Sequence, residues 1–317
     1  MQEQRSIKDY LLVFLKGICM GAADVVPGVS GGTIAFITGV YDEWLNSLKR
    51  CTPAVLLMLK REGLAKTWKH INGTFLVCLF GGILVSLKTL AALVLAGLEA
   101  FPILIWAFCS GLLMASVYPL AREQSGWGWP QWIGLLAGGV VVYLIANITP
   151  ATLPAYWWVL FLGGFVAICA MVLPGLSGSF ILLLVGLYPV FLTAIHELDI
   201  PKLLAFGVGC ICGLVLFSKF LSWLLAHYHR ETMPVLIGLL AGSVYVTWPW
   251  KKAVVTAYDS AGNEVVLQQA NLTPGDFLLQ TGQDPMLLGA ILAVVAGMVL
   301  VLGTEWIAMR MRKRPDL

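Results

Sequence analysis

The spacing of apolar and polar positions predicts a chain made of membrane-spanning helices. A bilayer core about 30 Å thick is crossed by roughly 20 consecutive apolar residues in a helix. Stretches of this kind recur along the chain, separated by short polar segments. They are 74–98, 101–120, 130–148, 203–226 and 285–308, with a shorter one, 234–250, between Pro234 and Pro249.

Two more apolar regions, 10–48 and 156–195, are interrupted near their middles. Each contains the sequence Pro-Gly-X-Ser-Gly. Proline and glycine end one helix and allow another to begin. We therefore expect each region to be a broken helical hairpin, which either crosses the bilayer twice or dips into it as a re-entrant loop.

The chain also contains an internal repeat. An offset of 147 residues superimposes VVPGVSGGTIAFITGVYDEWL on VLPGLSGSFILLLVGLYPVFL, with eight identities between Pro27 and Leu45. Offsets of 131 and 132 then place Lys88 on Lys219 and Pro102 on Pro234. The predicted fold is all-α and polytopic, with two copies of one unit, residues 1–150 and 151–317. Each unit is a broken hairpin followed by three spanning helices, an odd number of single crossings, so the two repeats should be inverted.

Composition and charge exclude several other classes. Hydrophobic residues make up 59% of the 317 and charged residues 12%, whereas a soluble domain carries about 25% charged residues. A net charge of +3 is too small to indicate a nucleic-acid-binding protein. Basic residues gather in 1–9, 49–73 and the C-terminal tail, which predicts that both termini are cytoplasmic and that loop 251–284 faces outside.

The two Pro-Gly-X-Ser-Gly breaks are the candidate binding site. A helix broken inside the bilayer leaves backbone groups unpaired unless they are buried in protein or line a polar cavity. The helix starting at each break would point its free N–H groups at mid-membrane, which favours an anion. Alternatively, the breaks only allow close helix packing, with the serines bonded to local carbonyls. The residues expected to bind a phosphate are Pro27, Gly28, Ser30, Gly31, Gly32 and Thr33 in the first break, and Pro174, Gly175, Ser177, Gly178 and Ser179 in the second.

Two lysines lie inside predicted spans, where charged groups are costly and usually functional. Lys88 and Lys219 occupy the middle of helices that the repeat makes equivalent. We expect them to act as a pair of cationic clamps on the phosphate. In the alternative, each lysine pairs with a carboxylate or a helix C-terminus for structural reasons.

Two carboxylates are candidates for coupling transport to an ion or proton gradient. Asp24 precedes the first break and has no counterpart, because Met171 takes the equivalent place. It is either the coupling group or a counter-ion to Lys16 or Lys88. Glu43, near the end of the first hairpin, is either a second coupling group or an interfacial carboxylate.

Signatures of catalysis and of cofactor binding are missing from the sequence. There is no His-Glu-X-X-His, no Cys-X-X-Cys and no Walker-type Gly-Lys-Ser/Thr. Most of the cysteines lie inside apolar runs without metal-ligand spacing. We therefore expect no enzyme activity, no metal and no cofactor.

The motifs resemble those of a known bacterial family. Residues 23–33, Ala-Asp-Val-Val-Pro-Gly-Val-Ser-Gly-Gly-Thr, and 174–179, Pro-Gly-Leu-Ser-Gly-Ser, are similar to the polyprenyl-phosphate (undecaprenyl-phosphate) transporters of the PopT type. The resemblance covers nearly the whole chain. It implies a flippase in the bacterial cytoplasmic (inner) membrane that returns undecaprenyl phosphate from the outer to the inner leaflet for reuse in cell-envelope synthesis. The expected partners are this lipid and the membrane, with homo-oligomers left open.

Two other classes of function would use the same features. An anion channel or small-anion carrier would conduct ions and ignore lipid tails. A non-catalytic scaffold for a lipid-phosphate enzyme would tolerate changes in both breaks.

Overall fold

The computed structural model describes residues 6–25, 30–52, 54–124, 126–148, 153–258 and 264–312. Helices dominate these residues, so the predicted helical membrane class is confirmed apart from one pair of strands. The elements in chain order are α1 (Ile7–Val25), α2 (Gly31–Ile37), α3 (Tyr41–Leu48), α4 (Ala54–Glu62), α5 (Leu64–His70), α6 (Gly73–Ala100), α7 (Pro102–Glu123), α8 (Trp129–Ala146), α9 (Trp157–Val172), α10 (Gly178–Leu184), α11 (Leu187–His196), α12 (Ile200–His227), α13 (His229–Val246), β1 (Lys251–Tyr258), β2 (Glu264–Asn271), α14 (Pro274–Thr281) and α15 (Leu287–Arg312).

The six apolar segments predicted to span the membrane coincide with α6, α7, α8, α12, α13 and α15. Among the described residues, three stretches are long and apolar enough to cross a bilayer alone, and two bent helix pairs raise the number to five. Large apolar side chains cover their outer faces, and Ile133 and Leu136 of α8 are 62% and 63% exposed. Water-soluble proteins rarely leave extended apolar surface uncovered. The chain is therefore a multi-pass membrane protein.

Two segments differ in detail from the sequence-based expectation. α13 begins at His229, so Pro234 lies inside this helix instead of before it. A proline inside a helix removes one backbone hydrogen bond. The loop 251–284 contains an antiparallel strand pair, with Lys251 opposite Asn271 and Tyr258 opposite Glu264, followed by α14.

The second arm of each broken hairpin consists of two short helices, where a single one was expected. Gly39 separates α2 from α3, and Gly186 separates α10 from α11. Both glycines have positive φ, 71° and 69°, a conformation that side chains disfavour. The chain bends by 111° between α10 and α11. Since α2 and α10 have only 7 residues each, at about 1.5 Å per residue neither can cross a bilayer core.

The helices form two compact units, which we describe separately. The first contains α1–α6 and α9–α12, and the second contains α7, α8, α13, α14, α15 and both strands. α6 and α13 each extend about one turn across the boundary. Each unit therefore combines helices from both halves of the sequence.

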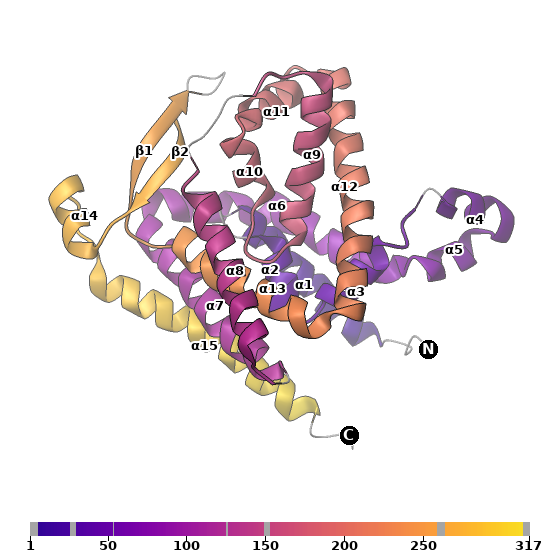
Figure 1. Ribbon diagram of the computed structural model, residues 1–317, viewed down its shortest axis with the longest axis horizontal. Helices are drawn as coiled ribbons and strands as arrows, with labels where there is room; N and C mark the ends of the chain where they lie inside the picture. The colour runs from indigo at the N-terminus through magenta and orange to yellow at the C-terminus, as the bar shows by residue number, and fades with distance from the viewer. Residues whose placement is uncertain are drawn as a thin grey trace. The chain divides into compact units, whose positions relative to one another are not determined.

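Glycines bring the helices of the first unit close together. α9 and α12 run side by side (Figure 1), and a Cβ atom at Gly209 of α12 would lie 2.0 Å from the carbonyl oxygen of Phe161 in α9. A Cβ atom at Gly82 of α6 would similarly lie 2.2 Å from the carbonyl oxygen of Phe14 in α1. Small residues at such crossings are the usual basis of tight helix packing in membranes.

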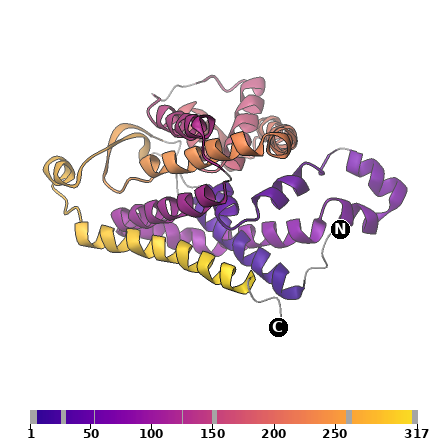
Figure 2. The ribbon, with the colours of Figure 1, turned by 60° about the horizontal axis from the view of Figure 1, so that its bottom comes forward.

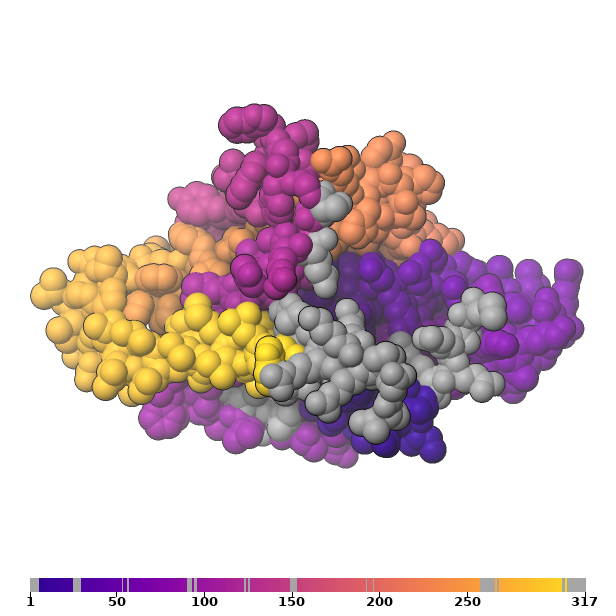
Figure 3. Space-filling model, turned by 90° about the horizontal axis from the view of Figure 1, so that it is seen from below, coloured from indigo at the N-terminus to yellow at the C-terminus, as the bar shows by residue number. Residues whose placement is uncertain are grey.

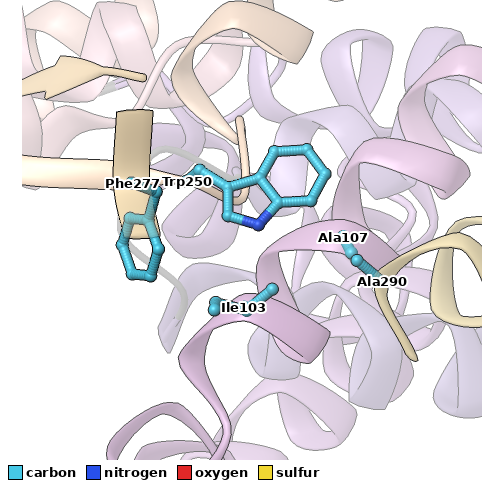
Figure 4. Packing of buried hydrophobic residues seen from close by; sticks show 5 residues of the cluster. All are labelled: Ile103, Ala107, Trp250, Phe277 and Ala290. Atoms are coloured by element: carbon cyan, nitrogen blue, oxygen red, sulfur yellow. The ribbon is translucent and has the colours of Figure 1, made fainter. Parts of the chain in front are cut away.

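The second unit is built on two further glycine crossings. α7 packs along α15 (Figure 2), where a Cβ atom at Gly111 would lie 2.1 Å from the Val294 carbonyl oxygen. The free face of α15, yellow in Figure 3, carries exposed leucine, isoleucine and valine side chains. The Trp250 indole packs into a core between α7, α14 and α15 (Figure 4) and donates a 2.9 Å hydrogen bond to the Pro285 carbonyl oxygen. The residues of this core are Ile103, Ala107, Trp250, Phe277 and Ala290.

These glycine contacts occur twice along the chain at constant offsets. In the first unit, Gly17 lies against the backbone of Leu79, and Gly82 lies against that of Phe14. The same contacts recur between Gly164 and Phe206 and between Gly209 and Phe161. In the second unit, Gly111 lies against the backbone of Val294, and Gly297 lies against that of Phe108; these contacts recur between Gly238 and Leu135 and between Gly138 and Val235. The offsets are 147 from α1 to α9, 127 from α6 and α7 to α12 and α13, and 159 from α8 to α15.

The offset of 127 corrects the alignment drawn from the sequence. It also superimposes the ends of α6 and α12, which both have 28 residues. Lys88 then corresponds to Val215, and Lys219 to Ala92. Four residues make about one helical turn, and over 82–95 the apolar sequence has more identities one turn out of register than at the offset of 127.

Candidate functional site

The two helix breaks meet within the first unit. The first separates α1 from α2, and the second, residues 173–177, separates α9 from α10. Pro27 and Gly28 lie outside the described residues, whereas the other candidate phosphate-binding residues are described. Ser30 and Thr33 are 1% and 0% exposed, so this part of the site is closed.

Asp24 closes the N-terminus of α2. Its Oδ1 accepts a 2.6 Å hydrogen bond from the backbone N–H of Gly31, and a Cβ atom at Gly31 would lie 2.6 Å from Oδ2. Ser30, the N-cap residue, accepts a 3.1 Å bond from the N–H of Gly32. The protein's own oxygens thus pair N–H groups that are free at most helix starts and that attract anions.

Three hydrogen bonds join the two hairpins at their breaks. Ser30 Oγ donates to the Met171 carbonyl oxygen (2.9 Å), Tyr41 Oη donates to the Val172 carbonyl oxygen (2.9 Å), and the Gly175 N–H donates to Thr33 Oγ1 (2.8 Å). Met171 and Val172 end α9, where carbonyl groups lack partners within the helix. The C-terminus of α9 therefore meets the N-terminus of α2, and side chains of the first hairpin pair backbone groups that the second hairpin leaves open.

The second break has no carboxylate at the position equivalent to Asp24. Met171 occupies this position, and the hydroxyls of Ser177 and Ser179 lie 2.9 Å apart. Ser177, the N-cap of α10, makes no side-chain cap hydrogen bond. Gly175 has a φ of 87° and is needed for the turn. The first break thus carries a negative charge, and the second carries hydroxyl groups.

The structure does not join the two candidate lysines to the breaks. Lys88 has an exposed side chain near the middle of α6, and Lys219 has one eight residues before the end of α12. In the described part of the chain, neither lysine makes a hydrogen bond or ion pair with the breaks. An exposed ammonium group within a membrane helix requires water or an anionic partner. A phosphate could be that partner, and this role is part of the proposed function.

Glu43 and Lys16 contact other parts of the first unit. Glu43 Oε1 accepts a 2.8 Å hydrogen bond from Asn72 Nδ2, which ties α3 to the turn between α5 and α6. Lys16 Nζ donates to the Thr38 carbonyl oxygen at 2.8 Å. These contacts stabilise the first hairpin.

Sequence reasoning missed Tyr41. Its signal was present, because Tyr41 matches Tyr188 at the offset of 147. The pattern nevertheless gave no indication that Tyr41 reaches the end of α9. The side chain is 3% exposed and packs edge-on against Phe36.

Replacing Tyr41 by phenylalanine should lower the free energy of unfolding by about 1–3 kcal/mol, because the buried Val172 carbonyl loses its partner. Thermal unfolding in detergent, followed by circular dichroism, would measure the change. Tyr118→Phe is the control, since the Tyr118 side chain is 63% exposed. Removing its hydroxyl group should change the free energy of unfolding by less than about 0.5 kcal/mol. Equal losses in both variants would contradict a specific role for Tyr41.

Two kinds of group at the breaks are suited to holding an anion, the backbone N–H groups and the serine and threonine hydroxyls. The Asp24 carboxylate occupies the start of α2, where it takes the place of an external anion. Across the residues that are described, no group of three histidine, cysteine, aspartate or glutamate side chains could hold a metal ion. Hydrogen bonds and helix ends are the means of binding that this arrangement offers.

Similarity to known proteins extends over nearly the whole chain. A family model described as undecaprenyl phosphate translocase-like matches residues 20–265, which include both breaks. A Vibrio cholerae protein named polyprenyl-phosphate transporter is 45% identical over 297 residues, covering 94% of this chain and 96% of its own length. The chain belongs to this family.

A second relative agrees with this assignment. A Staphylococcus aureus protein, also named polyprenyl-phosphate transporter, is 29% identical over 257 residues, covering 74% of this chain and 85% of its own length. No solved structure matches the chain. The family resemblance seen in the motifs is confirmed, and so is the expectation of a transporter in place of an enzyme.

Proposed function

We propose that the chain transports polyprenyl phosphate and acts as a flippase that returns undecaprenyl phosphate from the outer to the inner leaflet of the bacterial cytoplasmic membrane. The names of its relatives support the substrate. The observation that carries the proposal is the pair of interlocked helix breaks, in which α9 ends against the start of α2. Returned lipid is reused in cell-envelope synthesis.

The proposed architecture is two inverted repeats with re-entrant second arms. The glycine contacts that recur at offsets of 147, 127 and 159 support the duplication. The short α2 and α10 support re-entrant arms, because neither is long enough to span. With the basic segment 49–73 and both termini in the cytoplasm, this arrangement follows the positive-inside rule.

The phosphate is proposed to bind between the breaks while the polyprenyl tail stays in lipid. The second break offers Gly178 and the hydroxyls of Ser177 and Ser179 beside the start of α10, without a competing carboxylate. Ser30 and Thr33 are bonded to the opposite hairpin in this conformation. Their binding to a phosphate therefore requires the two hairpins to move apart during the cycle.

Asp24 is the proposed coupling group. Its carboxylate lies against the N–H groups of α2, where a negative charge is favoured by the helix end. Protonation of Asp24 would weaken this contact and make the start of α2 accessible to the substrate phosphate. Transport would then depend on a proton gradient, with Glu43 as a further candidate.

Lys88→Ala combined with Lys219→Ala should slow leaflet exchange by at least about tenfold, since each charge-assisted hydrogen bond to a phosphate contributes roughly 1.5–3 kcal/mol. The measurement is exchange of labelled undecaprenyl phosphate between leaflets of liposomes that contain the purified chain. Lys8→Ala with Lys252→Ala removes the same charge from exposed positions outside the spans and should leave the rate unchanged.

The same liposomes distinguish transport from conduction. A flippase should move the lipid without carrying an ionic current. Ionic current together with indifference to the lipid tail would identify an anion channel. Normal exchange in the double lysine variant would contradict the proposed clamp.

A further inference from the structure

A cationic hollow lies outside the residues of the two breaks, beside the end of α3. It has a volume of about 570 Å³, and α4 and α5, side by side at the right of Figure 1, form its walls. Its lining residues are Arg50, Met58, Glu62, Lys66, Lys69 and His70. The lining thus contains one arginine and two lysines but a single carboxylate.

Hydrogen bonds fix the walls of this hollow. Arg50 Nη1 donates to the His70 carbonyl oxygen at 3.2 Å, which holds the guanidinium group at the end of α5. Trp68 Nε1 donates to Thr74 Oγ1 at 2.9 Å, which joins α5 to α6. The hollow is therefore formed before a ligand arrives, and less ordering is needed when one binds.

The direction of α5 places the hollow at a membrane surface. α5 meets α6 at 69°, so when α6 crosses the bilayer, α5 lies closer to the membrane plane than to the membrane normal. Leu57, Leu64 and Trp68 of α4 and α5 are 59%, 73% and 42% exposed beside the basic side chains. A helix pair with exposed apolar and basic groups is typical of segments that lie in the lipid headgroup layer.

We propose that this hollow binds the phosphomonoester headgroup of a lipid at the membrane surface. A phosphomonoester carries about −1.5 to −2 charges near neutral pH, which matches the excess of two cationic side chains over carboxylates in the lining. Arg50 can bind two phosphate oxygens at once through its planar guanidinium group. This site is additional to the helix breaks, and its occupancy can be measured without transport.

The test is residue-resolved acylation of lysines in the full-length chain in detergent, read by mass spectrometry. Polyprenyl monophosphate in mixed micelles should lower the labelling of Lys66 and Lys69 by about fivefold or more near saturation. Lys60, exposed on α4 but outside the lining, is the matched control and should label at an unchanged rate. Phosphatidylglycerol, a phosphodiester, and inorganic phosphate at the same concentrations should protect neither Lys66 nor Lys69.

Arg50→Gln should abolish the protection of Lys66 by the lipid, whereas Arg61→Gln, which removes an equal charge outside the lining, should preserve it. Equal protection of Lys60, Lys66 and Lys69 would show general coverage by lipid and overturn the proposal. Protection by inorganic phosphate would assign the hollow to a free anion, and equal protection by phosphatidylglycerol would remove the monoester preference. Either result overturns the proposal. Loss of transport with intact protection would refute only the proposed transport function.

Discussion

Replacing Asp24 by asparagine is expected to slow leaflet exchange of polyprenyl phosphate by about tenfold to a hundredfold, the range that corresponds to losing one charged hydrogen bond. Asparagine keeps an oxygen that can accept from the Gly31 N–H, which Asp24 Oδ1 contacts at 2.6 Å. It cannot release a proton or carry a charge. The liposome exchange assay, run with and without a pH gradient, measures the effect.

Two further variants separate charge from helix capping. Asp24→Ala removes both the charge and the cap, and it should additionally lower the free energy of unfolding by about 1–2 kcal/mol.

Asp199 is the matched control. It caps α12 and forms a 2.7 Å ion pair with Lys202. The side-chain hydrogen bond from Lys202 lowers the pKa of Asp199. Because this cap lies at the start of α12, outside both breaks, Asp199→Asn should leave exchange unchanged. Full exchange with Asp24→Asn would limit Asp24 to capping.

Replacing Gly209 by leucine should lower the free energy of unfolding by about 2–3 kcal/mol, a typical cost of forcing extra atoms into a packed interface. A Cβ atom at Gly209 would already lie 2.0 Å from the Phe161 carbonyl oxygen. This neighbour is backbone and can move only if α9 and α12 separate. Thermal unfolding of the detergent-solubilised chain measures the loss.

Gly207→Leu provides the matched control on the same helix. A Cβ atom at Gly207 would meet nothing within 4 Å, and leucine favours helix over glycine by up to about 1 kcal/mol. This variant should be as stable as the original chain or slightly more stable. If both variants lose equal stability, the close approach of α9 and α12 is not the cause.

The positions of the spans were predictable from sequence because hydropathy records the thickness of the bilayer directly. α6 was expected at 74–98 and occupies Gly73–Ala100. The broken hairpins were predictable for a similar reason, since Pro-Gly interrupts a helix wherever it occurs. The subdivision of the second arms was missed because Gly39 and Gly186 were interpreted only as repeat identities.

Contacts between distant segments could not be predicted in the same way. Apolar helices resemble one another when shifted by one turn, so the identity of Lys88 and Lys219 outweighed the offset of 127 at which the glycine contacts recur. The bond from Tyr41 to Val172 joins two residues that are 131 positions apart and belong to different hairpins. Hydropathy contains no information about which helix end faces which side chain. Only the packed structure brings these groups together.

The unequal helix breaks have a consequence for the resting state of a carrier built from two inverted copies. With identical halves, the inward-facing and outward-facing conformations would have equal free energies. Asp24 stands at one break and Met171 at the other, so the chain's own carboxylate occupies one of the two proposed anion positions. For the proposed inverted repeats we therefore expect the two conformations to differ in free energy, and the empty carrier to rest mainly on one side of the membrane.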